Sequence, residues 1–173
     1  VDAPKAVVEE PKPAVDAPPV VVDLSQIEER DDLVYFEEKL FTGVAVEKDS
    51  NGQKKFKYSY RDGKLDGLRT RWHENGQKDW ETTWKDGNKH GLATAWYGNG
   101  QKWMVATFKD GKRDGLETWW YENGQKRWET TFKDGKEHGL WTDWYENGQK
   151  RSEGTSKDGK WHGLRTDWYK NEQ

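Results

Sequence analysis

The sequence predicts an all-β fold, an elongated antiparallel meander of about five and a half β-hairpin repeats after an extended or disordered N-terminal arm. Three markers that recur every 24 residues indicate this fold. The first is an asparagine, usually followed by Gly-Gln, at Asn51, Asn75, Asn99, Asn123, Asn147 and Asn171. The second is an Asp-Gly pair that begins at Asp62, Asp86, Asp110, Asp134 and Asp158. The third is a glycine that opens each unit, at Gly43, Gly67, Gly91, Gly115, Gly139 and Gly163.

Composition limits the core that this chain can build. Only 31% of its 173 residues are hydrophobic and 35% are charged, which normally leaves too little apolar surface to offset the entropy of ordering a chain. The aromatic residues reverse that conclusion, because the 12 Trp, 7 Tyr and 5 Phe each bury far more area than an aliphatic side chain. The composition therefore fits a thin sheet with a shallow core.

Charge and residue usage exclude several classes of function. The formal net charge is −3 and no basic stripe exists, so nucleic acid is not an expected partner. The absence of cysteine removes thiolate chemistry and cysteine-ligated metals. No apolar run reaches the roughly 20 residues of a transmembrane helix. The chain begins at Val1 without methionine, so it is either processed or a fragment of a longer chain. A removed signal peptide is one explanation, and on that reading we expect export to the periplasm, outer membrane or surface of a bacterium.

Residues 1–32 are expected to form the arm, and residues 33–173 the repeat domain. The arm holds all five prolines, with many Ala and Val, a composition that favours extended conformations without a core. It is either a solvated spacer or a tether that orders on a partner. Val20–Val22 is the segment expected to add as a strand to a sheet edge. Ser25 and Glu28 fit a capping box that would start a short helical turn to Asp31.

Residues 67–84 illustrate the expected fold of one repeat. Apolar and polar residues alternate on both sides of Asn75-Gly76, which predicts two strands joined by a hairpin turn whose residues tolerate positive φ. The link 85–91, which contains Asp86-Gly87, predicts a second and longer turn to the next hairpin. Repeated along the chain, this pattern gives about eleven short strands.

The length of the Asn-Gly loop decides which side chains share a face, because a slip of one residue turns a whole strand over. A two-residue loop would place Leu68, Thr70 and Trp72 beside Asp79, Glu81 and Thr83. We expect instead an odd-length loop, a type I turn with a glycine bulge, which gathers the apolar residues on one side. That side would carry four columns along the sheet. They are Leu68, Leu92, Leu116, Leu140 and Leu164; Trp72, Trp96, Trp120, Trp144 and Trp168; Phe56, Trp80, Met104 and Trp128; and Tyr60, Trp84, Phe108 and Phe132.

The last hairpin departs from these columns. Its inward positions become Ser152, Gly154 and Ser156, so the aromatic ladder is expected to stop there, as at a capping end. The open meander also leaves edge strands, and the strand 164–169 is a candidate edge for self-association.

The hexapeptide 121–126, Tyr-Glu-Asn-Gly-Gln-Lys, and the later Lys-Asp-Gly-Lys-x-His-Gly-Leu resemble the bacterial variant of the MORN repeat. The resemblance covers about Phe41 to Gln173, with five copies in register. It implies a β-hairpin solenoid that forms an elongated, twisted sheet. It also implies a scaffold or adaptor role, with lipid binding or antitoxin activity in some members. No residue signature of those roles can be carried over, and the many Trp depart from the commoner Tyr-rich pattern.

No catalytic, cofactor or metal site is expected. One repeat position holds His90, His138, His162, Asp66 and Asp114. Residues one repeat apart lie about 10 Å from each other, too far to share a metal, so turn capping explains this position better. The Asp-Gly pairs lack the alternating acids of a calcium loop. Acidic pairs such as Asp79 and Glu81 would point into water, where nothing excludes solvent as acid–base catalysis requires.

The central repeat breaks the charge pattern of the others. Positions that are charged in the preceding repeat become apolar, and Lys102 carries the only formal charge from 91 to 108. Such a patch is either covered, by a curled sheet or by residues 33–42, or it meets a partner. In the second case Trp103 and Trp119 are the expected hot spots. The candidate partner-binding residues are Ala93, Ala95, Tyr97, Trp103, Val105, Trp119 and Tyr121.

Three functions fit these observations. The leading one is a non-catalytic protein–protein interaction scaffold, or an accessory subunit of a larger envelope complex, that uses an aromatic face of the sheet. The second is carbohydrate or cell-wall binding through exposed Trp and Tyr, and the third is an antitoxin-like regulator. Lipid-surface binding ranks lower, because no Lys/Arg cluster would meet anionic headgroups.

Overall fold

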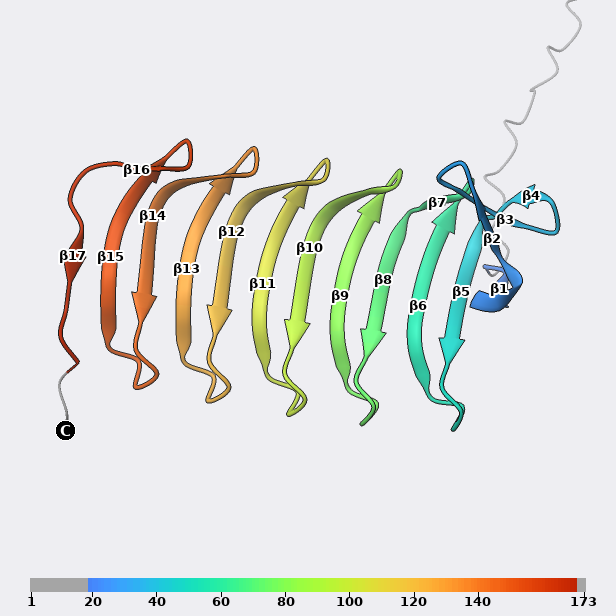
Figure 1. Ribbon diagram of the computed structural model, residues 1–173, viewed down its shortest axis with the longest axis horizontal. Coiled ribbons are helices and arrows are strands. Elements are labelled where there is room, and N and C mark those ends of the chain that lie inside the picture. Colours follow the sequence, from blue (N-terminus) through green and yellow to red (C-terminus); the bar gives the residue numbers. More distant parts are fainter. Residues whose placement is uncertain (1–18, 171–173) are drawn as a thin grey trace, which may run out of the picture.

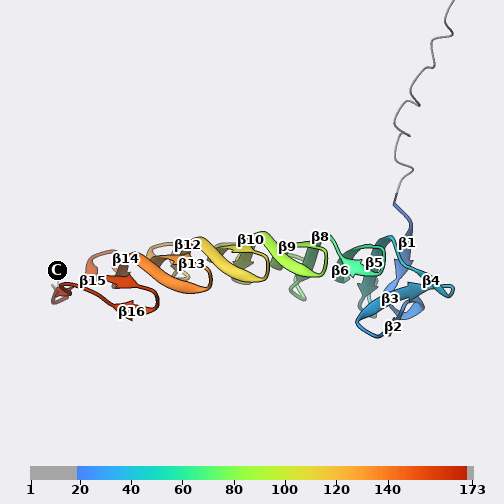
Figure 2. The same cartoon turned by 90° about the horizontal axis from the view of Figure 1, so that it is seen from above.

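The computed structural model describes residues 19–170, which form one long row of β-hairpins (Figure 1). A 14-stranded sheet runs along the row, and a three-stranded sheet lies at its N-terminal end. Seen from above, the row is narrow (Figure 2). The predicted all-β meander is therefore confirmed. The first 18 residues of the expected arm lie outside the described residues.

The long sheet follows the chain order, and each strand from β5 to β15 runs antiparallel to the next. Its main strands are β5 (Gly43–Lys48), β6 (Lys54–Arg61), β8 (Gly67–Trp72), β9 (Lys78–Lys85), β10 (Asn88–Trp96), β11 (Lys102–Lys109), β12 (Lys112–Trp120), β13 (Lys126–Lys133), β14 (Lys136–Trp144) and β15 (Lys150–Lys157). Three two-residue strands pair at its margins: β7 (Lys64–Leu65), β16 (Lys160–Trp161) and β17 (Thr166–Asp167).

The N-terminal end is closed by β1 (Val21–Asp23), which pairs in parallel with β5. This pairing confirms that the valine segment adds to a sheet edge. A 3-10 helix, η1 (Leu24–Gln26), leads to the small sheet of β2 (Glu28–Arg30), β3 (Leu33–Phe36) and β4 (Lys39–Leu40). Val22, Val34, Phe41 and Ala45 form a buried cluster here. Tyr60 packs against it, and burial raises the pKa of its hydroxyl to about 12.

The capping box lies two residues earlier than predicted. Asp23, not Ser25, is the N-cap: its carboxylate accepts a hydrogen bond from the Ser25 backbone, and the Gln26 side chain accepts one from the Asp23 backbone. The helix ends at Gln26, and residues 28–30 form β2, so the predicted helical turn to Asp31 is wrong. Pairing of β2 with β3 competes successfully with the weak helical signal.

The Asn-Gly loops are three-residue turns with a glycine in the left-handed region, as expected. In the loop 73–77, the Gly76 N–H donates to His73 O at 2.9 Å and Gly76 has a φ of +80°. Asn75 fixes the turn, because its Oδ1 accepts from the Gln77 N–H at 3.0 Å and its Nδ2 donates to Gly98 O of the next loop at 2.7 Å. These two bonds explain why Asn recurs in the turn, and the positive φ of Gly76 explains the glycine that follows it.

The Asp-Gly links are tighter than predicted. Asp86 and Gly87 have φ of +48° and +80°, so they form a two-residue turn of the primed type, and residues 88–90 already belong to β10. The strand then bends at Gly91, which has a φ of +94°. The expectation of a longer turn over 85–91 is wrong, because the left-handed Asp-Gly pair closes the hairpin by itself.

A second irregularity follows each Asn-Gly loop and reverses the predicted faces. Trp72 pairs with Lys78 and Arg71 pairs with Trp80, so one extra residue, Asp79, bulges from the return strand. The loop and this bulge each shift the pairing by one residue, and the two shifts cancel. The prediction that Leu68, Thr70 and Trp72 lie beside Trp80, Thr82 and Trp84 is therefore wrong. Glu81 and Thr83 lie beside them instead, as in the arrangement we set aside, but Lys78 takes the place of Asp79 opposite Trp72.

The two faces of the sheet differ in how their residues repeat, and we call them the variable face and the regular face. The variable face carries two positions of each first strand: Arg69, Ala93, Glu117, Trp141 and Arg165, and Arg71, Ala95, Trp119, Asp143 and Asp167. It also carries the column that begins with Phe56 and Trp80 and the one that begins with Tyr60 and Trp84. The regular face carries the Leu68 column, the Trp72 column and the threonines Thr70, Thr94, Thr118 and Thr142.

The aromatic ladder does not stop at the last hairpin. Trp141 pairs with Gly154 on the variable face and lies over it, and its ring centroid is 6.1 Å from that of Trp161. At the margin beyond β15, Leu164 and Tyr169 are exposed, and β17 contributes two residues to the pairing. Self-association through the strand 164–169 stays a prediction.

Candidate partner-binding face

Three tryptophans form the centre of the variable face. The ring centroids of Trp103 and Trp119 are 5.1 Å apart, and those of Trp80 and Trp103 are 6.0 Å apart. The rings are inclined to each other by 58° and 60°, and each is only partly buried. We call Trp80, Trp103 and Trp119 the tryptophan cluster. It forms an aromatic surface that remains open to solvent.

Small side chains beneath the cluster allow the indoles to lie against the sheet. Ala93 and Ala95 are fully buried, and Ala106 is 1% exposed. Ala95, Ala106 and the buried Met104 form a core that Trp80, Trp103 and Trp119 cover. The alternative that residues 33–42 cover the apolar patch does not apply, since β3 and β4 belong to the N-terminal sheet. The patch is covered in part by its own tryptophans.

The structure brings four of the predicted partner-binding residues to one face: Ala93, Ala95, Trp103 and Trp119. Val105 lies on the regular face, because it pairs with Thr94 and Thr118. The two alanines have no exposed surface to offer a partner, so they act as the floor of the cluster.

Tyr97 and Tyr121 connect one repeat to the next. Each hydroxyl donates a hydrogen bond of 2.8 Å to a backbone carbonyl of the following repeat, Trp120 O and Trp144 O respectively. His73 and Tyr145 make the equivalent contact in their repeats. Burial raises the pKa of Tyr97. These two residues therefore have a structural role that the sequence analysis missed.

The bulge explains the position of Trp103. Trp96 pairs with Lys102 and Ala95 pairs with Met104, so Trp103 is the extra residue, and its ring turns to the same face as Met104. Strand alternation alone would place Trp103 and Met104 on opposite faces. The sequence analysis therefore missed Trp80, Met104 and Ala106 as members of the same surface. Only the position of the bulge could have identified them.

The two faces differ in how strictly they repeat. On the regular face, the positions of Leu68, Thr70 and Trp72 hold the same residue types in the next three repeats. Thr70 and Thr118 there donate to Glu81 and Glu129 across the strands. On the variable face, the position of Arg69 becomes Ala, Glu, Trp and Arg in turn. The regular face thus presents the same residues in each repeat. The variable face differs from repeat to repeat, although it holds most of the buried apolar side chains.

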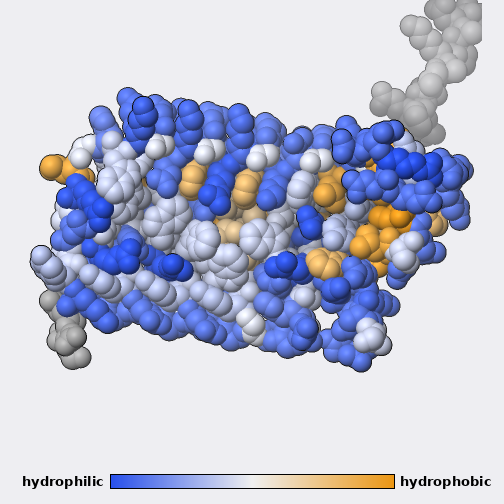
Figure 3. Space-filling model, viewed as in Figure 1, coloured by the Kyte–Doolittle hydropathy of each residue, from blue (hydrophilic) through white to orange (hydrophobic). Residues whose placement is uncertain are grey.

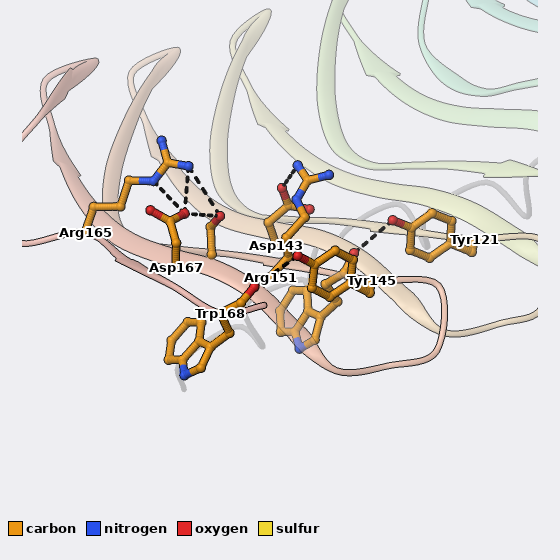
Figure 4. Close-up of polar contacts among 9 residues, drawn as sticks. Tyr121, Asp143, Tyr145, Arg151, Arg165, Asp167 and Trp168 are labelled. Carbon is orange, nitrogen blue, oxygen red and sulfur yellow. Dashed lines mark hydrogen bonds and ion pairs between the residues drawn. The ribbon is translucent and has the colours of Figure 1, made fainter. Parts of the chain in front are cut away.

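Ion pairs hold the C-terminal part of the variable face (Figure 4). Arg151 pairs with Asp143, and Arg165 donates to Asp167 Oδ1 from Nε at 2.9 Å. The Ser152 hydroxyl also donates to Asp167, at 2.6 Å. That hydrogen bond and the Arg165 guanidinium lower the pKa of Asp167. The charges in this part are largely neutralised by each other.

Two open hollows flank the tryptophan cluster. One, of about 310 Å³, is lined by Phe56, Arg69, Trp80, Trp84 and Lys89 among others. The other, of about 330 Å³, is lined by residues that include Trp119, Tyr121, Arg127 and Trp128. Figure 3 shows the molecule as a paler band between two hydrophilic margins, with the most apolar surface at the end formed by β1–β5.

The geometry places the charged candidates in structural roles. Asp66 accepts a hydrogen bond from the backbone N–H of Asp86, and His90 Nδ1 lies 3.3 Å from Asp110 Oδ1. Asp66 thus caps the Asp86-Gly87 turn as predicted, whereas His90 Nδ1 makes no hydrogen bond within the described residues. Asp79 pairs with Arg71 on the variable face, whereas Glu81 contacts Thr70 on the regular face. Strand alternation predicts that Asp79 and Glu81 lie on one side of the sheet. Because of the bulge at Asp79, they lie on opposite faces.

The described residues contain no group of three or more His, Asp or Glu that could hold a metal ion. Within the same range, no helix has the length and apolarity to cross a membrane.

Comparison with known proteins supports the repeat assignment. Residues 89–110, 113–134 and 137–158 match the family model described as MORN repeat variant. These three matches are consecutive and follow the 24-residue step of the sequence. No curated protein matches the chain.

Proposed function

Residues 89–158 of this chain are three MORN repeats of the variant type, and on that premise we propose that the protein is a non-catalytic protein-interaction scaffold or accessory subunit. MORN repeats are generally involved in protein or membrane-lipid binding and are generally non-catalytic. The proposed docking surface is the variable face, centred on the tryptophan cluster.

The contrast between the two faces carries this proposal. A repeated sheet needs equivalent contacts in each repeat, and the regular face supplies them. The variable face instead places three large, partly exposed indoles on a floor of alanines in the central repeats. Trp is among the residue types that dominate binding energy at protein interfaces.

The inclination of the indoles favours a protein partner. The rings of Trp80, Trp103 and Trp119 meet at 58° and 60°, so they form a ridged surface and not one flat platform. Side chains of a protein can fit such ridges. Carbohydrate binding, an antitoxin-like role and membership of an exported envelope complex stay predictions from the sequence.

Replacement of two indoles tests the proposal. The double variant Trp103→Ala/Trp119→Ala is expected to lose the partner that the wild-type chain retains in a pull-down from the source organism. Hot-spot residues cost about 2 kcal/mol or more each when truncated, which corresponds to at least a thirtyfold loss of affinity.

The matched control is Trp96→Ala. Trp96 follows Ala95 in β10 and therefore lies on the regular face of the same repeats. The control should retain the partner, and circular dichroism should give the same strand content for all three proteins. Equal retention by the double variant and the wild type would contradict the assignment of this face.

A further inference from the structure

The arginines of the described chain divide into two groups. Six of the eight make ion pairs with a neighbouring carboxylate: Arg30, Arg61, Arg71, Arg113, Arg151 and Arg165. The guanidinium groups of Arg69 and Arg127 make no ion pair or hydrogen bond with any residue from 19 to 170. Both lie on the variable face, one on each side of the tryptophan cluster.

Arg69 lies in the first hollow beside the cluster. Its guanidinium is 5.1 Å from the ring centroid of Tyr58, and the side chain is partly buried. Phe56 and Trp80 form walls of the same hollow. Lys89, which also lines it, makes no ion pair within the described chain and lies 5.2 Å from the ring of Phe108. Two cations are thus held by aromatic rings with their hydrogen-bond donors unused.

Arg127 lines the second hollow, and its side chain is exposed. Its guanidinium is 5.8 Å from the ring centroid of Tyr121, and Trp119 and Trp128 line the same hollow. The neighbouring Arg151 is already paired with Asp143. Arg127 is therefore the free cation of this hollow, although the chain as a whole is acidic.

The separation of the two sites sets the length of a ligand that could reach both. Arg69 lies in β8 and Arg127 in β13, which are five strands apart in the sheet order. With about 4.8 Å between strands, the sites are about 24 Å apart. An extended peptide advances about 3.3 Å per residue, so about seven residues span that distance. The tryptophan cluster lies between the two ends.

We propose that the variable face binds an extended segment of a partner protein that carries one acidic residue at each end of an apolar stretch of about seven residues. One carboxylate binds Arg69 with Lys89, the other binds Arg127, and the apolar side chains cover Trp80, Trp103 and Trp119. A guanidinium donates two parallel hydrogen bonds to a carboxylate, and aromatic neighbours hold it in place for that contact. This inference rests on the proposed docking face and specifies its partner.

Synthetic peptides provide the probe. Three peptides share one seven-residue centre of alternating Val, Phe and Thr, and differ only at the two residues that flank it, which are both Glu, both Gln or both Lys. These two residues are eight positions apart, so both side chains point to the same side of an extended chain. Acetylated and amidated termini leave those ends as the only charges. Calorimetry with the full chain should give the tightest binding for the Glu peptide and the weakest for the Lys peptide. Added salt should reduce the difference.

Charge-removing variants assign the sites. Arg69→Gln and Arg127→Gln should each raise the Kd of the Glu peptide about fivefold and leave the Kd of the Gln peptide unchanged. Arg61→Gln, at an ion-paired arginine outside both hollows, is the matched control and should change neither.

Three other outcomes would contradict the inference. Equal binding of all three peptides would show that the ligand does not need acidic ends; it would not contradict the docking face, which the Trp103→Ala/Trp119→Ala pull-down tests separately. If none of the peptides binds, the ligand is not an extended segment of this kind. Displacement of the Glu peptide by vesicles containing phosphatidylserine, with loss of vesicle binding in both arginine variants, would assign the cations to a membrane surface instead.

Discussion

Gly154 shows how one residue accommodates a change in its neighbour. A Cβ atom at this position would lie 2.8 Å from Cζ2 and 3.0 Å from Cε2 of Trp141, which is 8% exposed. The equivalent positions in earlier repeats hold Thr82, Ala106 and Thr130, so the slot tolerates a side chain wherever no indole lies over it. The glycine and the tryptophan therefore form a matched pair.

The variant Gly154→Ala tests this pairing. We expect a loss of about 1 to 3 kcal/mol in the free energy of unfolding, because the added methyl group overlaps a ring that cannot move without exposing its own surface. Urea denaturation measures the loss. In a Trp141→Ala background the same substitution should cost little, and additive effects of the two changes would show that the ring does not press on Gly154.

At the residue scale, the sequence shows which residues are unusual better than it shows which face of the sheet their side chains lie on. Ser152, Gly154 and Ser156 predict an end to the aromatic ladder because they are small, but in the structure the ring of Trp141 from the neighbouring strand lies over Gly154. Trp103 and Trp119 were recognised as unusual from the absence of charge around them. Val105 belongs to the same uncharged run but faces the other way, and only the bulge before it determines that.

Each hairpin is joined to the next by a side chain at the end of its first strand. The Tyr121 hydroxyl donates to Trp144 O at 2.8 Å, and the same contact recurs at His73, Tyr97 and Tyr145. Backbone hydrogen bonds between adjacent strands also join the two repeats. The Tyr121 hydrogen bond joins a side chain of one repeat to the backbone of the next. It should therefore contribute to the coupling between repeats.

The variant Tyr121→Phe removes this bond and keeps the ring. We expect the free energy of unfolding to fall by about 0.5 to 1.5 kcal/mol, the usual net contribution of one hydrogen bond. Urea denaturation again gives the value. Tyr169→Phe is the matched control, because Tyr169 holds the equivalent position but is 94% exposed. A loss of the same size in both variants would contradict the role of the Tyr121 contact.

At the element scale, loop chemistry was predictable and strand pairing was not. Asn-Gly-Gln specifies a turn because the Asn side chain and the left-handed Gly satisfy it locally. Asp-Gly was recognised as a turn but its two-residue length was missed. The bulge at Asp79 has no local signature, since a charged residue in that position fits either face. The bulge arises from the pairing between strands, and it determines which side chains lie on each face of the sheet.

On the scale of the whole molecule, the period of 24 residues predicts the long sheet. The two faces of that sheet have different roles. The regular face repeats the contacts that stack one hairpin on the next. The variable face carries the tryptophan cluster between the hollows of Arg69 and Arg127. The period alone could not assign a function to either face, because it describes what the repeats share and recognition depends on how they differ.

The most direct test of the two-face account is hydroxyl-radical footprinting of the protein alone and in complex with the partner retained in the pull-down. Mass spectrometry would measure oxidation at each tryptophan. We expect the partner to protect Trp103 and Trp119 and to leave Trp72, Trp96 and Trp144 of the regular face as reactive as before. Protection of the regular-face tryptophans, with Trp103 and Trp119 unchanged, would contradict it.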